Sequence, residues 1–237
     1  MCIFTFLIYH TNASFFFGCN TAIRKHAGSF YILAALIVLF EVIYYETGLV
    51  DTTPEWITSY IINPFKRGAL STAMFIVVMY IGALNAKKPA ISKLVGIRGE
   101  LSIIACILTL GHNIVYGRHI FVNLFTNPAE MKPQALIASI ISIIMIAIML
   151  PLMLTSFAAV RKRMSLAAWK SLQRWAYVFF ALIYAHVMVL FLPKFSEKYL
   201  DIIAYTFIFR AYAVLRVTKA VKASKNTLPQ REYAGKA

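Results

Sequence analysis

The sequence is poor in acidic residues, in paired cysteines and in glycine-rich motifs. Its 237 residues contain 9 Asp and Glu against 24 Lys and Arg, and its 3 cysteines form no CxxC pair. This cysteine usage speaks against a Cys-rich zinc site and against covalently attached c-type haem. The chain has neither a glycine-rich nucleotide fingerprint nor an internal repeat, so nucleotide-binding and repeat architectures are not indicated.

Apolar residues, by contrast, are abundant. They make up 60% of the chain, whereas soluble domains contain about 45–50%, and the mean hydropathy is +0.72. In a soluble protein the net charge of +15 would suggest nucleic-acid binding. Here the basic residues cluster in short loops between apolar runs, which is the pattern of membrane topology. We therefore expect a membrane protein that contacts lipid and has no nucleic-acid partner.

Six apolar segments are each long enough to cross about 30 Å of hydrocarbon as a helix. Backbone polar groups find no water in lipid, so each segment is expected to be helical. The predicted fold class is all-α, an integral membrane bundle of six transmembrane helices. The six segments are residues 28–50, 68–86, 99–121, 134–157, 172–193 and 199–217.

Two terminal regions flank the predicted bundle of residues 28–217. Residues 1–27 combine a hydrophobic stretch, broken by "HTNAS", with the basic pair Arg24 and Lys25. A signal peptide would place its basic residues first. An extra short helix, an interfacial segment and a misplaced start all fit, so this segment is left unassigned. Residues 218–237 are mostly polar and are expected to form a basic cytoplasmic tail.

The loops between the segments alternate in basic content. If both ends of the bundle share a side, 17 Lys and Arg fall on that side and 6 on the other. The side rich in Lys and Arg is cytoplasmic. We therefore expect a multi-pass protein of the cell membrane, inner or plasma, with both ends of the six-helix core in the cytoplasm.

Two histidines fall within these predicted spans. His112 lies 13 residues beyond Gly99 and His186 lies 14 residues beyond Leu172, which places them about 20 Å and 21 Å from the inner ends of their helices. Both helices run in the same direction, so the two imidazoles are expected at one level in the outer half of the bilayer. The topology depends only on the Lys and Arg residues of the loops, so the equal depth of the two histidines is independent of it.

Two imidazoles at one depth on two helices suggest axial ligands of a b-type haem, which binds in an apolar slot between facing helices. Polar groups at such depth are costly and usually functional. Two alternatives remain open. A single buried histidine is more often a hydrogen-bonded structural residue, and zinc usually requires a third or fourth ligand. His112 and His186 are thus the candidate cofactor-binding and metal-ligating residues.

Four further residues are secondary candidates. His119 is expected about 10 Å nearer the outer surface than His112, as an interfacial residue or a partner for a haem propionate or an electron acceptor, and Arg118 is its neighbour. Glu41 and Arg210 interrupt apolar segments. One interpretation is a proton or quinone site, or an Arg210 that anchors a haem propionate. The simpler interpretation is a structural ion pair, or side chains that extend their charged ends toward the membrane surface.

The stretches "RGELSIIACILTLGH" and "WKSLQRWAYVFFALIYAH" resemble the third and fifth helices of the ferric reductase-like transmembrane domain family. In size and loop pattern the chain is most similar to that family's MsrQ-like (YedZ-like) haem-binding membrane subunits. The resemblance covers roughly residues 68–217. It implies six helices, a b haem between the third and fifth helices, and electron transfer across or out of the membrane.

Family members with two haems use two histidine pairs, and this resemblance places the outer pair at His112 and His186. The inner pair would fall on Arg98 and Gln173, neither of which is an ordinary haem ligand, so one haem b per chain is expected. The flavin and nicotinamide domain of the larger members is not among the 237 residues. A quinone or a partner's flavin would then supply the electrons.

The sequence thus predicts a b-type cytochrome, the electron-transfer subunit of an oxidoreductase system. Its donor would be quinol or a cytoplasmic flavoprotein, and its acceptor a redox partner protein on the outer side. Two rival functions remain. One is a membrane transporter whose histidines form a substrate, proton or metal site, and the other is a haem-free scaffold or assembly subunit with structural histidines.

Overall fold

The computed structural model describes residues 20–234, with side chains described to residue 224. Every regular element in this part of the chain is helical, which confirms the predicted all-α class. Residues 1–19 of the unassigned N-terminal segment lie outside the described residues. The elements are α3 (Ala27–Glu46), α4 (Leu49–Thr52), α5 (Glu55–Ile57), the π-helical turn η1 (Thr58–Ile62), α6 (Asn63–Lys66), α7 (Ala69–Ala83), α8 (Pro89–Gly96), α9 (Arg98–Val115), α10 (Arg118–Thr126), η2 (Pro128–Glu130), α11 (Pro133–Leu154), α12 (Ala158–Arg161), α13 (Leu166–Gln173), α14 (Trp175–Phe191), η3 (Leu192–Lys194) and α15 (Phe195–Ala234).

Several of these helices are long and apolar enough to cross a membrane. Three stretches qualify on their own, namely Ala27–Glu46, Pro133–Leu154 and Leu166–Ser224. Two bent pairs raise the number to five if each pair is one span: the segment Glu55–Lys66 with α7, bent by 50°, and α8 with α9, bent by 53°. The described residues therefore fit a multi-pass membrane protein with three to five candidate spans, and the predicted six spans are not confirmed.

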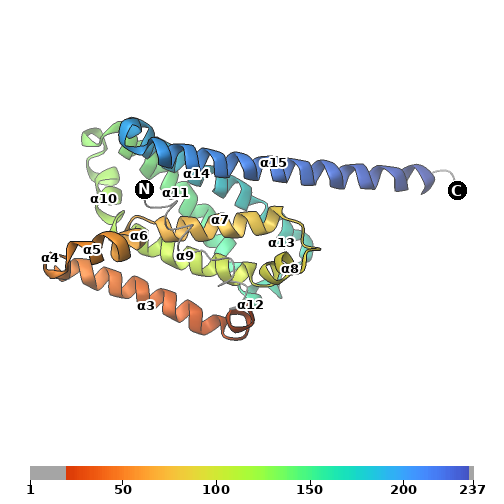
Figure 1. Ribbon diagram of the computed structural model, residues 1–237, viewed down its shortest axis with the longest axis horizontal. Helices are drawn as coiled ribbons and strands as arrows, with labels where there is room; N and C mark the ends of the chain where they lie inside the picture. Colours follow the sequence, from red (N-terminus) through yellow and green to blue (C-terminus); the bar gives the residue numbers. More distant parts are fainter. Residues whose placement is uncertain (1–19, 235–237) are drawn as a thin grey trace.

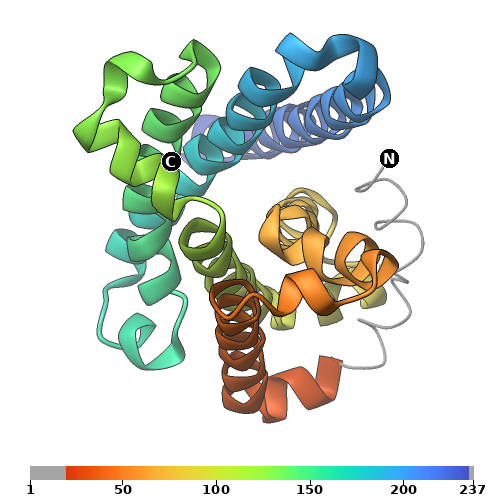
Figure 2. The ribbon, with the colours of Figure 1, turned by 90° about the vertical axis from the view of Figure 1, so that its left-hand side faces the viewer.

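The helices form two packed groups that meet along α7 and α9. In one group α9 packs against α3 and α7, and in the other α14 packs against α11 and α15. Viewed from one end of the bundle (Figure 2), α9 lies near the centre, with α3, α7 and α11 around it. Figure 1 shows α14 and α15 side by side, with the chain reversing its direction at η3.

The short helices gather at the two ends of the bundle (Figure 1). α8, α12 and α13 lie at one end, and α4, α5 and α10 lie at the other. The first three belong to the loops that carry most of the Lys and Arg residues. Loops that were predicted to share a side thus lie together, and we call their end the basic end.

The contact between α3 and α9 depends on a glycine. A Cβ atom on Gly111 would lie 2.6 Å from Cγ2 of Val38, closer than side-chain carbons approach one another. Gly111 is buried, and it directly precedes His112. The absence of a side chain at this position therefore allows α3 to pack closely on α9 beside the histidine.

The predicted third span, residues 99–121, is wrong at its outer end. α9 ends at Val115, and the chain turns before α10 begins at Arg118. A Cβ on Gly117 would lie 2.8 Å from the carbonyl oxygen of Asn113, so the turn closes too tightly for a larger residue. At the other end of the chain, α15 continues without a break through residue 217 into the basic tail.

The substitution Gly111→Ala tests the packing of α3 on α9. We expect it to destabilise the protein by about 1–3 kcal/mol because overpacking shifts the branched Val38 side chain. The loss should shrink in the double variant Gly111→Ala/Val38→Ala, in which the clashing methyl groups are gone. Thermal unfolding in detergent measures both effects.

The matched control is Gly28→Ala, since a Cβ at Gly28 would meet nothing within 4 Å. It should be neutral or slightly stabilising, because alanine favours the helix over glycine. Equal losses at positions 111 and 28 would contradict the close α3–α9 contact.

Candidate functional site

His112 lies near the outer end of α9 and is held by the chain segment that precedes α7. Its Nδ1 is within hydrogen-bond distance of the carbonyl oxygen of Lys66. A carbonyl oxygen can only accept, so Nδ1 carries the proton and Nε2 keeps its lone pair. The ring also lies parallel to that of Tyr116, with 5.7 Å between the centroids and 14° between the planes.

Gly68 allows the His112 ring to occupy this position. Its φ of 67° is in the left-handed region, which glycine adopts without steric cost. A Cβ on Gly68 would lie 3.1 Å from Cγ of His112, so the imidazole packs directly on the glycine backbone. Glycine at this position therefore allows both the turn into α7 and the close approach of the imidazole ring.

His186 is held in the same way from α11. Its Nδ1 lies 3.2 Å from the carbonyl oxygen of Ala138 and 3.3 Å from Oγ of Ser142. The Ser142 hydroxyl donates to the same carbonyl at 2.9 Å, so Nδ1–H is shared between the carbonyl and the serine oxygen. Nε2 of His186 therefore also keeps its lone pair.

The structure places the two histidines near each other, and their pairing around one ligand stays a prediction. They come from α9 and α14, which belong to different packed groups. Both side chains are half-buried. Among the described residues neither Nε2 atom has a hydrogen-bond partner.

In this arrangement each imidazole keeps one nitrogen free of hydrogen-bond partners among the described residues. A metal-bound imidazole usually donates its other N–H to a carbonyl or carboxylate, which fixes the tautomer and orients the ring. Within residues 20–224 no group of three His, Cys, Asp or Glu side chains could hold a metal ion. Two imidazoles are fewer ligands than a zinc ion usually takes.

The outer candidates His119 and Arg118 lie beyond the end of α9, on α10. His119 is exposed on α10 rather than on a continuation of α9, and its ring meets the edge of Tyr116 at 6.5 Å. Arg118 forms an ion pair with Glu46 at 2.8 Å. Both of these side chains are mostly exposed, so the pair adds about 1 kcal/mol or less to stability.

The ion pair considered between Glu41 and Arg210 is wrong. Glu41 is buried, with 3% of its surface exposed, and it interacts with the charge of Lys66. Arg210 is exposed on α15. Oε1 of Glu41 has no hydrogen-bond partner among the described residues, so a costly buried polar atom lies on the helix that packs beside His112.

The two positions that the resemblance assigns to an inner ligand pair have structural partners. Nε of Arg98 donates to the carbonyl of Val78 at 3.2 Å. Nε2 of Gln173 donates to Oγ1 of Thr155 at 3.2 Å. Each side chain thus helps to join neighbouring helices at the basic end.

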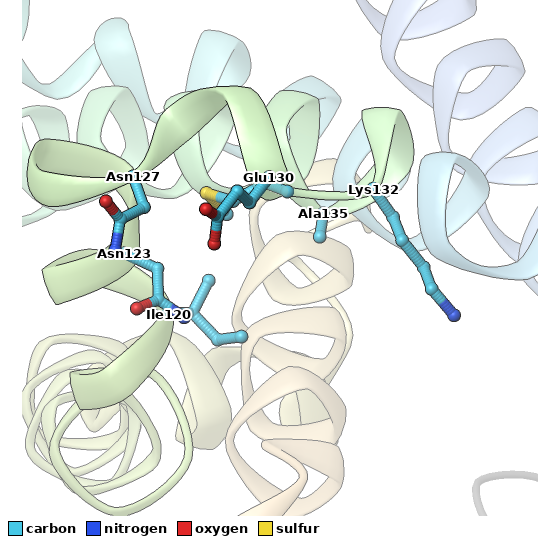
Figure 3. Close-up of a pocket in the computed structure, with 7 residues that line it drawn as sticks. Ile120, Asn123, Asn127, Glu130, Lys132 and Ala135 are labelled. Carbon is cyan, nitrogen blue, oxygen red and sulfur yellow. The ribbon is translucent and has the colours of Figure 1, made fainter.

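A surface pocket at the opposite end was not foreseen from the sequence. It lies between α10, η2 and the start of α11, and Figure 3 shows its polar side chains, with Lys132 directed away from the others. The pocket is lined by Ile120, Asn123, Asn127, Glu130, Met131, Lys132 and Ala135. The residues that hold the histidines were missed too, although the glycine of "KRGAL" before an apolar segment signals a turn.

Comparison with known proteins identifies no family for this chain. No family model matches it, and no solved structure does. It is 35% identical over 207 residues to an uncharacterized protein of Treponema pallidum (strain Nichols), an alignment that covers 86% of this chain and 57% of that protein. The chain thus spans little more than half the length of that relative, and the ferric reductase-like resemblance stays a prediction.

The chain contains a matched pair of variants that test the role of Gly68. Gly68→Ala and Gly48→Ala both place a side chain at a positive φ, 67° and 72° respectively, so both carry a similar backbone cost of about 1–2 kcal/mol. Only the first adds a methyl group against the His112 ring. A Cβ at Gly48 would meet only Oδ2 of Asp51, at 3.5 Å.

We expect Gly68→Ala to raise the reactivity of His112 toward diethylpyrocarbonate, measured by mass spectrometry of the modified peptide, because the ring is displaced from its carbonyl. Gly48→Ala should leave this rate unchanged. If both variants changed it equally, Gly68 would have no specific role at His112.

Proposed function

We propose that this protein is a multi-pass membrane cytochrome that holds one haem b between His112 and His186 and passes electrons to an acceptor on the outer side. The observation that carries the proposal is the paired geometry of the two imidazoles. Each donates its Nδ1–H to a neighbouring helix or turn and leaves Nε2 free. When bound there, haem would supply a one-electron iron couple whose potential depends on its axial ligands and surroundings.

The residues around the imidazoles have defined tasks in this proposal. The carbonyls of Lys66 and Ala138 keep each Nδ1 protonated, which makes Nε2 the more basic ligand atom. Gly68 and Tyr116 both pack against the His112 ring and hold it in place.

The residues at the basic end of the bundle support a single haem per chain. Arg98 and Gln173 would have to give way to a second ligand pair, but both are engaged in hydrogen bonds between helices. Arginine also stays protonated in proteins and offers no lone pair. The proposal therefore places the redox centre nearer the end that carries α4, α5 and α10.

The proposed topology has six spans, with α14 and α15 crossing separately. It is supported by the reversal of the chain at η3 and by the side-by-side packing of these two helices. With the basic end in the cytoplasm, the acceptor would approach α10, His119 and the pocket of Figure 3. Quinol in the membrane or a cytoplasmic flavoprotein would supply the electrons.

A transporter is the second candidate function, and one observation favours it. Two of the candidate spans are bent by 50° and 53° at short breaks, and broken helices are common where transporters bind ions and substrates. In that case, or in a haem-free scaffold, the same hydrogen bonds would hold structural histidines.

Haem content decides between these functions. Full-length protein purified from haem-replete cells should show a reduced-minus-oxidised spectrum of low-spin haem. His112→Ala and His186→Ala should each lose most of the haem or turn it high-spin, because one axial position opens. His119→Ala is the matched control and should keep the low-spin spectrum, since His119 lies on another helix.

Colourless, folded wild-type protein would contradict the proposal and favour a transporter or scaffold. So would a normal spectrum in both the His112 and His186 variants.

The number of haems is a separate prediction. A pyridine haemochrome assay should return one haem per chain, because the inner positions are occupied by Arg98 and Gln173. A value of two would mean that another pair of ligands exists.

A further inference from the structure

Three basic side chains converge on the end of α7. Arg216 and Lys219 reach it from α15, and both donate to the carbonyl oxygen of Gly82, at 3.1 Å and 3.0 Å. Lys219 also donates to the carbonyl of Leu84 at 3.0 Å. Arg98 reaches the same turn from the start of α9, with Nη2 lying 3.1 Å from where a Cβ of Gly82 would be. We call Arg98, Arg216 and Lys219 the cation cluster.

The cation cluster carries more positive charge than its surroundings neutralise. The end of a helix contributes about half a negative charge, whereas the cluster holds three positive charges that interact with one another. No carboxylate of the described residues forms an ion pair with any member. Like charges held together without a counter-charge favour the binding of an anion.

The cluster also has free hydrogen-bond donors. Arg98 uses Nε to bind the carbonyl of Val78, while its Nη1 and Nη2 have no acceptor among the described residues. The Arg98 side chain is half-buried rather than fully enclosed, and neither Nη atom is a fully buried atom without a partner. Two parallel N–H groups of a guanidinium match two oxygens of a phosphate.

The position of the cluster indicates where its anion comes from. Gly82 and Leu84 lie at the basic end, where α7 leads toward α8. Tyr177 is exposed and stands under the Arg216 guanidinium, with 4.8 Å from the ring centroid to Cζ, and aromatic rings favour the level of lipid headgroups. Basic pockets between membrane helices on the cytoplasmic side bind anionic lipid headgroups.

We infer that the cation cluster is a binding site for the phosphate of an anionic phospholipid, which bridges the start of α9, the end of α7 and α15. Arg98 and Lys219 supply the donors, and Arg216 holds α15 against α7. The inference does not depend on the haem proposal, because none of these residues contacts His112 or His186.

The test is native mass spectrometry of the full-length protein in detergent with added phosphatidylglycerol. Wild-type protein should retain this lipid and should not retain phosphatidylcholine, which has no net charge. Lys219→Gln should weaken the affinity about fivefold, as expected for one basic residue near a lipid surface. Lys222→Gln is the matched control, since Lys222 is exposed on the same helix three residues later and should change the affinity by less than about twofold.

Arg98→Lys keeps the charge but removes the two parallel N–H groups of the guanidinium, and it should also weaken the affinity for the lipid. Equal effects of Lys219→Gln and Lys222→Gln would overturn the site, because general charge would then explain the binding. Equal retention of phosphatidylcholine would overturn it as well. If inorganic phosphate at millimolar concentration displaced the lipid, the site would belong to free phosphate and the lipid assignment would be wrong.

Discussion

The constraint on which this structure depends is that polar groups inside lipid must find their partners within the protein. The hydroxyls of Thr109 and Ser142 meet it by donating to the carbonyls four residues earlier in their own helices. His112 and His186 meet it by donating Nδ1–H to carbonyls of neighbouring segments. These hydrogen bonds also fix the tautomer of both imidazoles, so that each Nε2 keeps its lone pair.

Lys66 links the two unusual features of the outer half of the bundle. Its carbonyl oxygen accepts from His112, and its ammonium group lies 3.7 Å from the centre of the Tyr45 ring and interacts with the charge of buried Glu41. The short segment before α7 therefore positions the histidine with its backbone and the local charge with its side chain. Gly68, two residues later, gives the chain the turn that both contacts require.

The sequence predicts much of the fold and the central pair of the site. Hydropathy locates the apolar helices, and equal helical rise predicts one level for His112 and His186. Their lateral separation depends on how α9 and α14 pack, which spacing along the chain does not give. The end of α9 was missed because it depends on the tight turn at Gly117 rather than on hydropathy. The ion pair of Arg118 with Glu46 also depends on that turn, because the turn places Arg118 next to Glu46.

The central claim is that two histidine Nε2 atoms hold one haem iron. Electron paramagnetic resonance of the ferric protein, with all histidines labelled with ¹⁵N, tests it most directly. The account predicts a low-spin signal with hyperfine couplings from two imidazole nitrogens, and the loss of this low-spin signal in His112→Ala. A high-spin signal from the wild-type protein, or a signal with a single imidazole coupling, would contradict it.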